Sequence, residues 1–440
     1  MFKLLFIILI FFLLSFLNKL FYICISYNFF ISNIILNIIT INLCISFVFL
    51  WFIYFMYLII YIILFLLSRR IYSYIKFIYI WYMIIIITNA VSLLSIIEDF
   101  ATFVILFESL FFPICFISLF FSFSNRFIFA IFCLILFSSL SSILCMLIFF
   151  ILISHIGIID INIFIEFCFL DSPFLNITIL TLLIILFFIK YPVWPLHIWL
   201  PEVHVEVTTE ISIILAAIVL KMGFFGLYKF VIITLIQFCN WWLGLIDVFI
   251  LLGIFFLTIT ILFLCDYKKL IAHWSILHTG IGLILVWHQD ILFTGLVILC
   301  NLAHIISSSF MFYLVGHMYD NHGLRVFLLL ITFFGYSMWS SFFIGLVLFN
   351  IDFPFMLLFF VELIICTGFA MFSSLYLILF GLLSIIMFST SVYIYITLNF
   401  FSFIWINKNI KLDLTINDII IVYFISFIVL KLFYFFFLLI

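Results

Sequence analysis

Three of the six prolines of this 440-residue chain come just after a lysine that ends a long apolar run. Residues 174–189 carry no charge, and Lys190 is followed by Pro192, Pro195 and Pro201. Each proline removes a backbone donor and clashes with the preceding turn. At membrane depth, a broken helix is tolerated only inside protein or beside a water-filled cavity, and a lysine there is costly. The stretch therefore predicts an ion-handling site rather than a simple membrane anchor.

Other ionisable side chains also lie within apolar segments: Glu108, Lys221, His278, His304, Glu362 and Lys431. A charge at the bilayer centre costs about 2.5–3.5 kcal/mol even on the insertion scale. A snorkelling side chain would account for any one of these residues taken singly, and best for Lys431. The whole set together predicts an ion pathway. A rise of about 1.5 Å per residue on either side of the 288–290 turn places His278 and His304 within about 5 Å of the same depth. Since histidine changes charge near neutral pH, the two side chains can pass a proton between them.

These residues must be positioned by membrane-spanning helices, because 70% of the chain is hydrophobic and only 7% is charged. The apolar runs predict an all-α, polytopic transmembrane bundle of about fourteen helices. They lie near residues 4–20, 22–40, 42–67, 76–97, 100–123, 127–153, 174–200, 209–235, 245–265, 270–287, 291–316, 328–375 (broken near Pro354), 376–400 and 416–440.

The loop charges favour counting 328–375 as one broken pass. One side of the membrane then holds Lys19, Arg69, Arg70, Lys76, Arg126, Lys268, Lys269, Arg325, Lys408 and Lys411. The other side holds Glu98, Asp99, Asp160, Glu166, Asp171, Asp290 and both termini. Such an excess of Lys and Arg marks the side that is not translocated.

The spacing of the ionisable residues indicates an internal repeat. Glu108 precedes Lys190 by 82 residues, and His278 precedes Glu362 by 84. We expect two inverted five-helix repeats with broken helices near 190–201 and 350–356, a transporter pattern in which the ion site lies at the breaks. The predicted regions are N-terminal helices (1–75), a first repeat (76–235), a second repeat (245–400) and a C-terminal loop and helix (401–440).

The sequence gives no sign of bound cofactors or metals. The ten cysteines form no C-x-x-C pair or Cys/His cluster, and no phosphate-binding glycine motif occurs. Nucleic-acid binding is not expected. Trp194 and Trp199 are predicted to be membrane-interface anchors.

Five segments carry a resemblance to a known family: FESLFFP (107–113), KYPVWPLHIWLPEVHVE (190–206), AAIVLKMGFFGLYK (216–229), DYKKLIAHWSILH (266–278) and FTGLVILCNLAHIISSSFMF (293–312). They resemble the antiporter-like subunits of respiratory complex I, the H⁺-translocating NADH:ubiquinone reductase, over about residues 98–366. The glutamate at the second break, Glu362, distinguishes the chain from chains 2 and 5 of that complex, which carry a lysine there.

The resemblance implies a role for each residue. Glu108 pairs with Lys190, Lys221 is the connecting lysine, His278 and His304 form the central polar axis, and Glu362 is the exit carboxylate. It also implies the mitochondrial inner membrane with the basic loops in the matrix, and FMN and iron–sulfur clusters in partner subunits only. Partners would be other membrane-arm subunits, chains 2 and 5 especially, and lipids such as cardiolipin.

Some positions depart from the family pattern. Thr208 replaces a proline, Glu210 replaces an alanine, Val361 replaces a glycine, and Pro354 is the only proline left at the second break. These four departures affect the geometry of helix ends and leave the ionisable residues named above unchanged. His204 and Glu206, just past the first break, are weaker candidates for proton entry.

Three alternatives remain open from the residues alone. A stand-alone cation/proton antiporter of the related family would show the same lysines and prolines. Chain 2 or chain 5 of the complex would share most motifs. In a structural scaffold subunit, the buried charges would only pair helices.

Overall fold

The computed structural model describes residues 74–97, 99–121, 125–156, 173–232, 240–287 and 291–322, with parts of 362–366 and 378–392. The chain divides into two compact units, Met1–Leu50 and Trp51–Ile440, and every described residue belongs to the second. The predicted helices before residue 74 and after 392, most of the 328–375 pass with its break near Pro354, and Lys431 lie outside the described residues.

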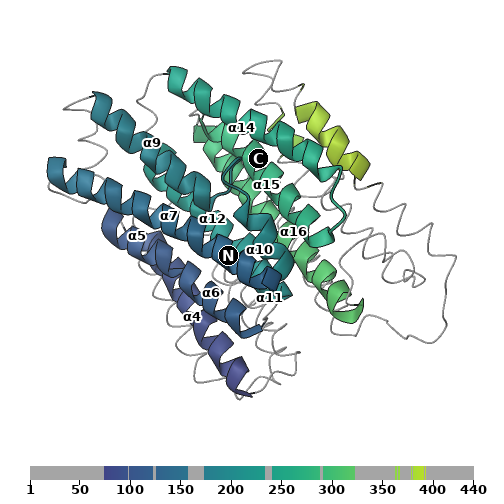
Figure 1. Ribbon diagram of the computed structural model, residues 1–440. Coiled ribbons are helices and arrows are strands. Elements are labelled where there is room, and N and C mark those ends of the chain that lie inside the picture. The colour runs from purple at the N-terminus through teal and green to yellow at the C-terminus, as the bar shows by residue number, and fades with distance from the viewer. Residues whose placement is uncertain are drawn as a thin grey trace, which may run out of the picture. The chain divides into compact units, whose positions relative to one another are not determined.

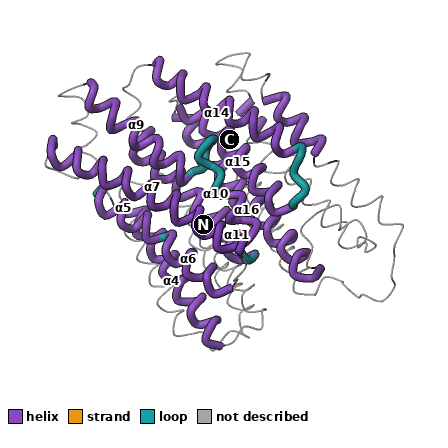
Figure 2. Tube along the Cα trace, in the orientation of Figure 1, coloured by secondary structure: helices purple, strands orange, loops and turns teal. Residues whose placement is uncertain are grey.

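The described part is an all-α bundle, as predicted, and Figures 1 and 2 show only helices and connecting loops in it. Its elements are α4 (Tyr74–Ile96), α5 (Phe100–Ser109), α6 (Phe111–Phe121), α7 (Asn125–Ile156), α9 (Pro173–Lys190), α10 (Trp199–Glu206), α11 (Thr209–Ile214), η2 (Leu215–Val219), α12 (Leu220–Leu227), η3 (Tyr228–Ile232), α14 (Asn240–Ile261), α15 (Tyr267–Trp287) and α16 (Ile291–His322). Residues 380–390 are also helical.

The segment predicted as one helix over 100–123 is interrupted at Leu110, between α5 and α6. Pro113 accounts for the interruption, since proline lacks an amide hydrogen and clashes with the carbonyl four residues earlier. The Leu110 N–H donates instead to the carbonyl of Phe107 at 3.4 Å. Glu108 therefore lies in the last turn of α5, beside a helix end.

The predicted first break is present. α9 ends at Lys190, and α10 begins only at Trp199. The prediction of an interface anchor is wrong for Trp199, whose side chain is buried and donates its indole N–H to the carbonyl of Ile189 at 3.0 Å. Trp199 thus joins the two sides of the break, because the last carbonyls of α9 have lost their helical partners.

The segment after the break is helical but not uniformly α-helical. It runs from α11 to η3 (Thr209–Ile232) and contains two π-helical turns, η2 and η3, where a plain helix was predicted. α12 approaches the end of α9 closely at Gly223, where an added Cβ would lie 2.9 Å from the backbone nitrogen of Tyr191. Only glycine permits this approach. It brings α12, the helix that carries Lys221, against the backbone of Lys190 at the end of α9.

Three described segments are long and apolar enough to cross a membrane: Phe100–Leu119, Arg126–Ser154 and Thr209–Val231. They differ in burial, because 94% of the Thr209–Val231 window lies inside the bundle and only 22% of the Arg126–Ser154 window does. The segment with Lys221 is therefore central, whereas α7 is peripheral. α15 packs against α14, α16 and α10, while α11 and η2 pack against α16.

Candidate functional site

The site begins with a partly buried ion pair at the first break. Lys190 Nζ lies 3.0 Å from Glu108 Oε2, so α5 and α9 bring together the two residues predicted to pair. The lysine side chain is 1% exposed and the glutamate side chain 22% exposed. A buried lysine needs an opposite charge and further hydrogen-bonding or cation–π partners to remain charged.

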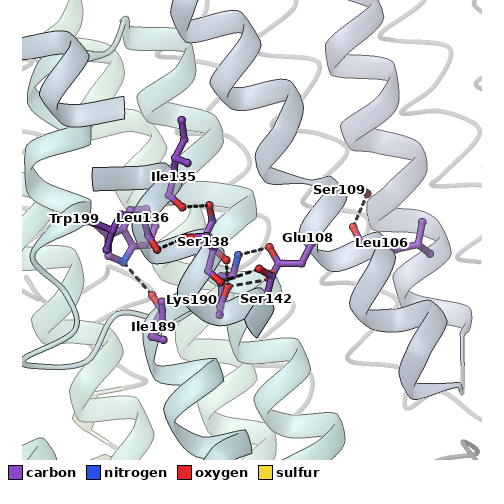
Figure 3. A network of polar contacts seen from close by, with 12 residues as sticks. Leu106, Glu108, Ser109, Ile135, Leu136, Ser138, Ser142, Ile189, Lys190 and Trp199 are labelled. Carbon is purple, nitrogen blue, oxygen red and sulfur yellow. Dashed lines mark hydrogen bonds and ion pairs between the residues drawn. The ribbon is translucent and has the colours of Figure 1, made fainter. Parts of the chain in front are cut away.

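Two residues that the sequence analysis missed complete the surroundings of this pair. Lys190 Nζ lies 3.4 Å from the centroid of the Phe111 ring, a cation–π contact. The hydroxyl of Ser141 on α7 lies 2.9 Å from Glu108 Oε1, and Figure 3 shows the pair beside the serines of this helix. The available signal for Ser141 was the polar run Ser-Ser-Leu-Ser-Ser (138–142) inside an apolar helix.

A second contact joins Lys221 to His304. Lys221 Nζ lies 2.7 Å from His304 Nδ1 and donates to the carbonyl of Ala216 at 3.1 Å. The π-turn η2 explains why this carbonyl accepts the ammonium. In an α-helix the Leu220 N–H would bond Ala216, but here it bonds Leu215.

A third contact joins His278 to Glu362, with 2.8 Å between Nδ1 and Oε1. The rings of His278 and His304 have centroids 5.8 Å apart. Lys221, His304, His278 and Glu362 therefore follow one another in space, and all four side chains are buried. The two histidines, which the sequence predicts to lie at the same depth, are thus neighbours in space.

Tyr191, also missed, links the end of α9 to the helices that carry the histidines. Its hydroxyl donates to Asn301 Oδ1 at 3.0 Å and lies 3.4 Å from the carbonyl of Thr279. Asn301 lies one turn before His304, and Thr279 follows His278 directly. The residue after Lys190 is thus fixed against both histidine helices.

The basic residues at the start of α15 bind α10 and the residue that follows it. The prediction of a loop position is wrong for Lys268, which is buried in α15 and donates to the carbonyl of Val207 at 3.0 Å. Lys269 pairs with Glu202 at 2.5 Å. The buried bond from Lys268 fixes the end of the short helix that follows the break.

The weaker candidates for proton entry differ in burial. His204 is fully buried and stacks on Phe312, with ring centroids 4.5 Å apart. Neither of its ring nitrogens has a hydrogen-bond partner within the described segments. Glu206 is half-exposed, and Glu210 is buried at the start of α11. Within the same segments, no group of three His, Cys, Asp or Glu residues is placed to hold a metal ion.

A bundle of apolar helices with paired ionisable side chains in its interior is the architecture of an integral membrane protein. The model of the family described as NADH:quinone oxidoreductase/Mrp antiporter, transmembrane, matches residues 98–390. The chain therefore belongs to this family.

Curated relatives include NADH-ubiquinone oxidoreductase chain 4 of Acanthamoeba castellanii, 32% identical over 228 residues. That match covers 52% of this chain and 46% of the relative. Chain 4 of Triticum aestivum is 37% identical over 140 residues, 32% of this chain and 28% of the relative. The match thus spans less than half the length of either relative.

Solved structures share the fold at low sequence identity. A chain of respiratory complex I from Thermus thermophilus is 16% identical with a TM-score of 0.74, covering 88% of this chain and 80% of that one. A chain of an archaeal membrane-bound sulfane sulfur reductase is 15% identical with a TM-score of 0.72, covering 87% and 79%.

Proposed function

We propose that this chain is a proton-translocating membrane-arm subunit of respiratory complex I, corresponding to chain 4. NADH oxidation and ubiquinone reduction in other subunits would drive it. The observation that carries the proposal is the 3.0 Å contact between the buried Lys190 and the partly exposed Glu108. The relatives named chain 4 and the glutamate at position 362 support the particular subunit.

The first pair (Glu108 and Lys190) is the switch in this mechanism. At about 4 Å, opposite charges attract by roughly 4 kcal/mol at an effective dielectric constant of 20. Glu108 beside Lys190 therefore holds the lysine in its charged form. When Glu108 moves away, burial favours the neutral amine, and Lys190 releases its proton into the bundle.

The remaining pairs provide the route for that proton. Lys221 receives the proton, and its Nζ lies 2.7 Å from Nδ1 of His304. His304 and His278 pass it on, and Glu362, 2.8 Å from His278, releases it. The close packing of α12 on α9 at Gly223 supports the step from Lys190 to Lys221.

The setting of the subunit is part of the proposal. The chain would lie in the mitochondrial inner membrane with its basic loops in the matrix and both termini on the intermembrane-space side. It would hold no redox centre, since FMN and the iron–sulfur clusters belong to partner subunits. Chains 2 and 5 would be neighbours, and cardiolipin a bound lipid. The two repeats would cover residues 76–235 and 245–400.

Replacing Glu108 by glutamine tests the proposal. Glu108→Gln removes the charge with little change in volume, so NADH-driven proton uptake into sealed inner-membrane vesicles should fall by roughly a hundredfold. Assembly of the complex should persist. Normal proton uptake by this variant would refute the scheme.

Glu202→Gln is the matched control. Glu202 is 36% exposed and pairs with Lys269, outside the proposed route. An exposed ion pair contributes about 0–1 kcal/mol, so uptake should stay near the wild-type rate. Copurification with flavin and iron–sulfur subunits separates the complex I proposal from a stand-alone antiporter.

A further inference from the structure

Four serines lie within residues 138–142 of α7, and one of them, Ser141, makes a different set of contacts from the rest. Each donates its hydroxyl to the carbonyl three residues earlier, at 2.9 Å for Ser138, 2.8 Å for Ser139, 2.6 Å for Ser141 and 2.8 Å for Ser142. Among the four, only Ser141 has a second acceptor in range, Glu108 Oε1 at 2.9 Å. Ser141 is also fully buried, whereas Ser139 is exposed.

A serine hydroxyl carries a single hydrogen, so it makes one strong donor bond at a time. The hydrogen of Ser141 therefore has two positions. In one it bonds the carboxylate of Glu108, a charge-assisted bond of the stronger kind. In the other it bonds the carbonyl of Ser138, as serines in helices commonly do.

We propose that Ser141 is a positioning residue, a two-position donor that holds Glu108 against Lys190 and releases it without leaving a buried donor unpaired. This inference rests on the proposed function of the first pair. With Glu108 in place, Lys190 bonds Oε2 and Ser141 bonds Oε1, so both carboxylate oxygens are fixed. When Glu108 leaves, the hydroxyl turns to the Ser138 carbonyl, and the desolvation cost of an orphaned donor is avoided.

Ser141 is the hydrogen-bond donor to Oε1 of Glu108 among the side chains that surround the first pair. Glu108 is 22% exposed, so its carboxylate lies at the edge of the bundle rather than locked inside it. On α6 and α7, the side chains near the pair also include the Phe111 ring, which faces Lys190, and the thiols of Cys115 and Cys145. A thiol is a weak donor and does not replace the hydroxyl.

The test compares Ser141→Ala with Ser141→Thr and Ser142→Ala in the assembled complex. The threonine keeps the hydroxyl, and Ser142 is the control on the same helix because its hydroxyl bonds only Ser139. Loss of one hydrogen bond predicts that Ser141→Ala lowers proton uptake per NADH about two- to tenfold. Ser141→Thr and Ser142→Ala should stay near wild type.

A spectroscopic measurement separates positioning from packing. The infrared carboxylate band that Glu108→Gln abolishes should shift in Ser141→Ala and keep its wild-type frequency in the other two variants. Ser141→Cys preserves the side-chain volume with a weak donor, and it should behave as Ser141→Ala does. This variant decides the matter should the alanine variant fail to assemble.

Two results would overturn the inference: equal uptake and equal band positions in Ser141→Ala and Ser142→Ala, or equal losses in Ser141→Ala and Ser141→Thr. The first leaves the hydroxyl without a role, and the second assigns the effect to packing. Failure of the proposed function looks different. In that case Glu108→Gln itself would pump normally, whatever the serine variants do.

Discussion

The first pair and the second pair (His278 and Glu362) occupy matching places in the sequence but have different surroundings. Their members are 82 and 84 residues apart and touch at 3.0 Å and 2.8 Å. The first pair has a carboxylate that is 22% exposed, whereas the second has one that is 9% exposed. The first also has a serine donor and a phenyl ring of its own, whereas the second continues directly into His304 and Lys221.

The same spacing in the sequence thus places two carboxylates in different surroundings. A carboxylate at the bundle edge has room to move, and its lysine partner is held by separate contacts. A carboxylate buried at the end of a continuous file is suited to taking a proton from its neighbour. Under the proposed function, the first pair is therefore suited to switching and the second to conducting protons.

The largest effect should come from neutralising both members of the first pair. Glu108→Gln combined with Lys190→Met should lower NADH-driven proton uptake by roughly a hundredfold, as the single Glu108→Gln change does. Lys190→Met alone leaves the carboxylate of Glu108 without its charged partner, an imbalance that the double variant removes, so the double variant should assemble better than Lys190→Met alone. Vesicle proton uptake and the amount of assembled complex are the measurements.

The scaffold alternative makes the opposite prediction for this double variant. If the charges only pair helices, neutralising both should restore activity along with assembly. Repeating the experiment with His278→Asn and Glu362→Gln shows whether the second pair obeys the same rule. Recovery at one pair and not at the other would break the assignment of both to a single route.

A smaller effect should follow from Gly223→Ala, which separates the first pair from Lys221. The added Cβ would lie 2.9 Å from the Tyr191 nitrogen and 3.0 Å from the Lys190 carbonyl carbon, so α12 must move away from α9. Such overpacking costs about 1–3 kcal/mol. Both the thermal unfolding temperature of the complex and its proton uptake should fall.

Gly244 on α14 provides the control for this change. Nothing lies within 4 Å of a Cβ added there. Alanine in an open helix is better than glycine by about 0.5–1 kcal/mol, so Gly244→Ala should leave stability unchanged or slightly higher. Equal losses from both alanine variants would show that the α9–α12 contact is not specific.

The smallest effect should come from Phe111→Leu, which removes the ring facing Lys190. A cation–π contact contributes about 0.5–2 kcal/mol, and its loss should slow proton uptake about two- to thirtyfold. The adjacent Phe112 is 63% exposed, so Phe112→Leu should leave uptake unchanged. An unchanged rate in Phe111→Leu would mean that Glu108 alone governs the charge of Lys190.

Much of the site could be predicted from single residues. A charge in an apolar run is conspicuous because it is expensive in lipid, and that cost identified Glu108, Lys190, Lys221 and Glu362. Ser141, Phe111 and Tyr191 could not be found in this way. Serine, phenylalanine and tyrosine are ordinary in membrane helices, and what sets these three apart is the residue they face.

Three features could be predicted from the sequence alone: the all-helical membrane fold, the break after Lys190 and the set of ionisable residues. Each follows from local physics, since apolar length specifies a spanning helix and proline ends one. The structure was needed to show which charges meet, that the buried Trp199 side chain joins the two sides of the break, and that a π-turn gives the Lys221 ammonium a carbonyl acceptor. Those features depend on close approach between segments some ten to 84 residues apart or on a shift in backbone register, and no local pattern specifies either.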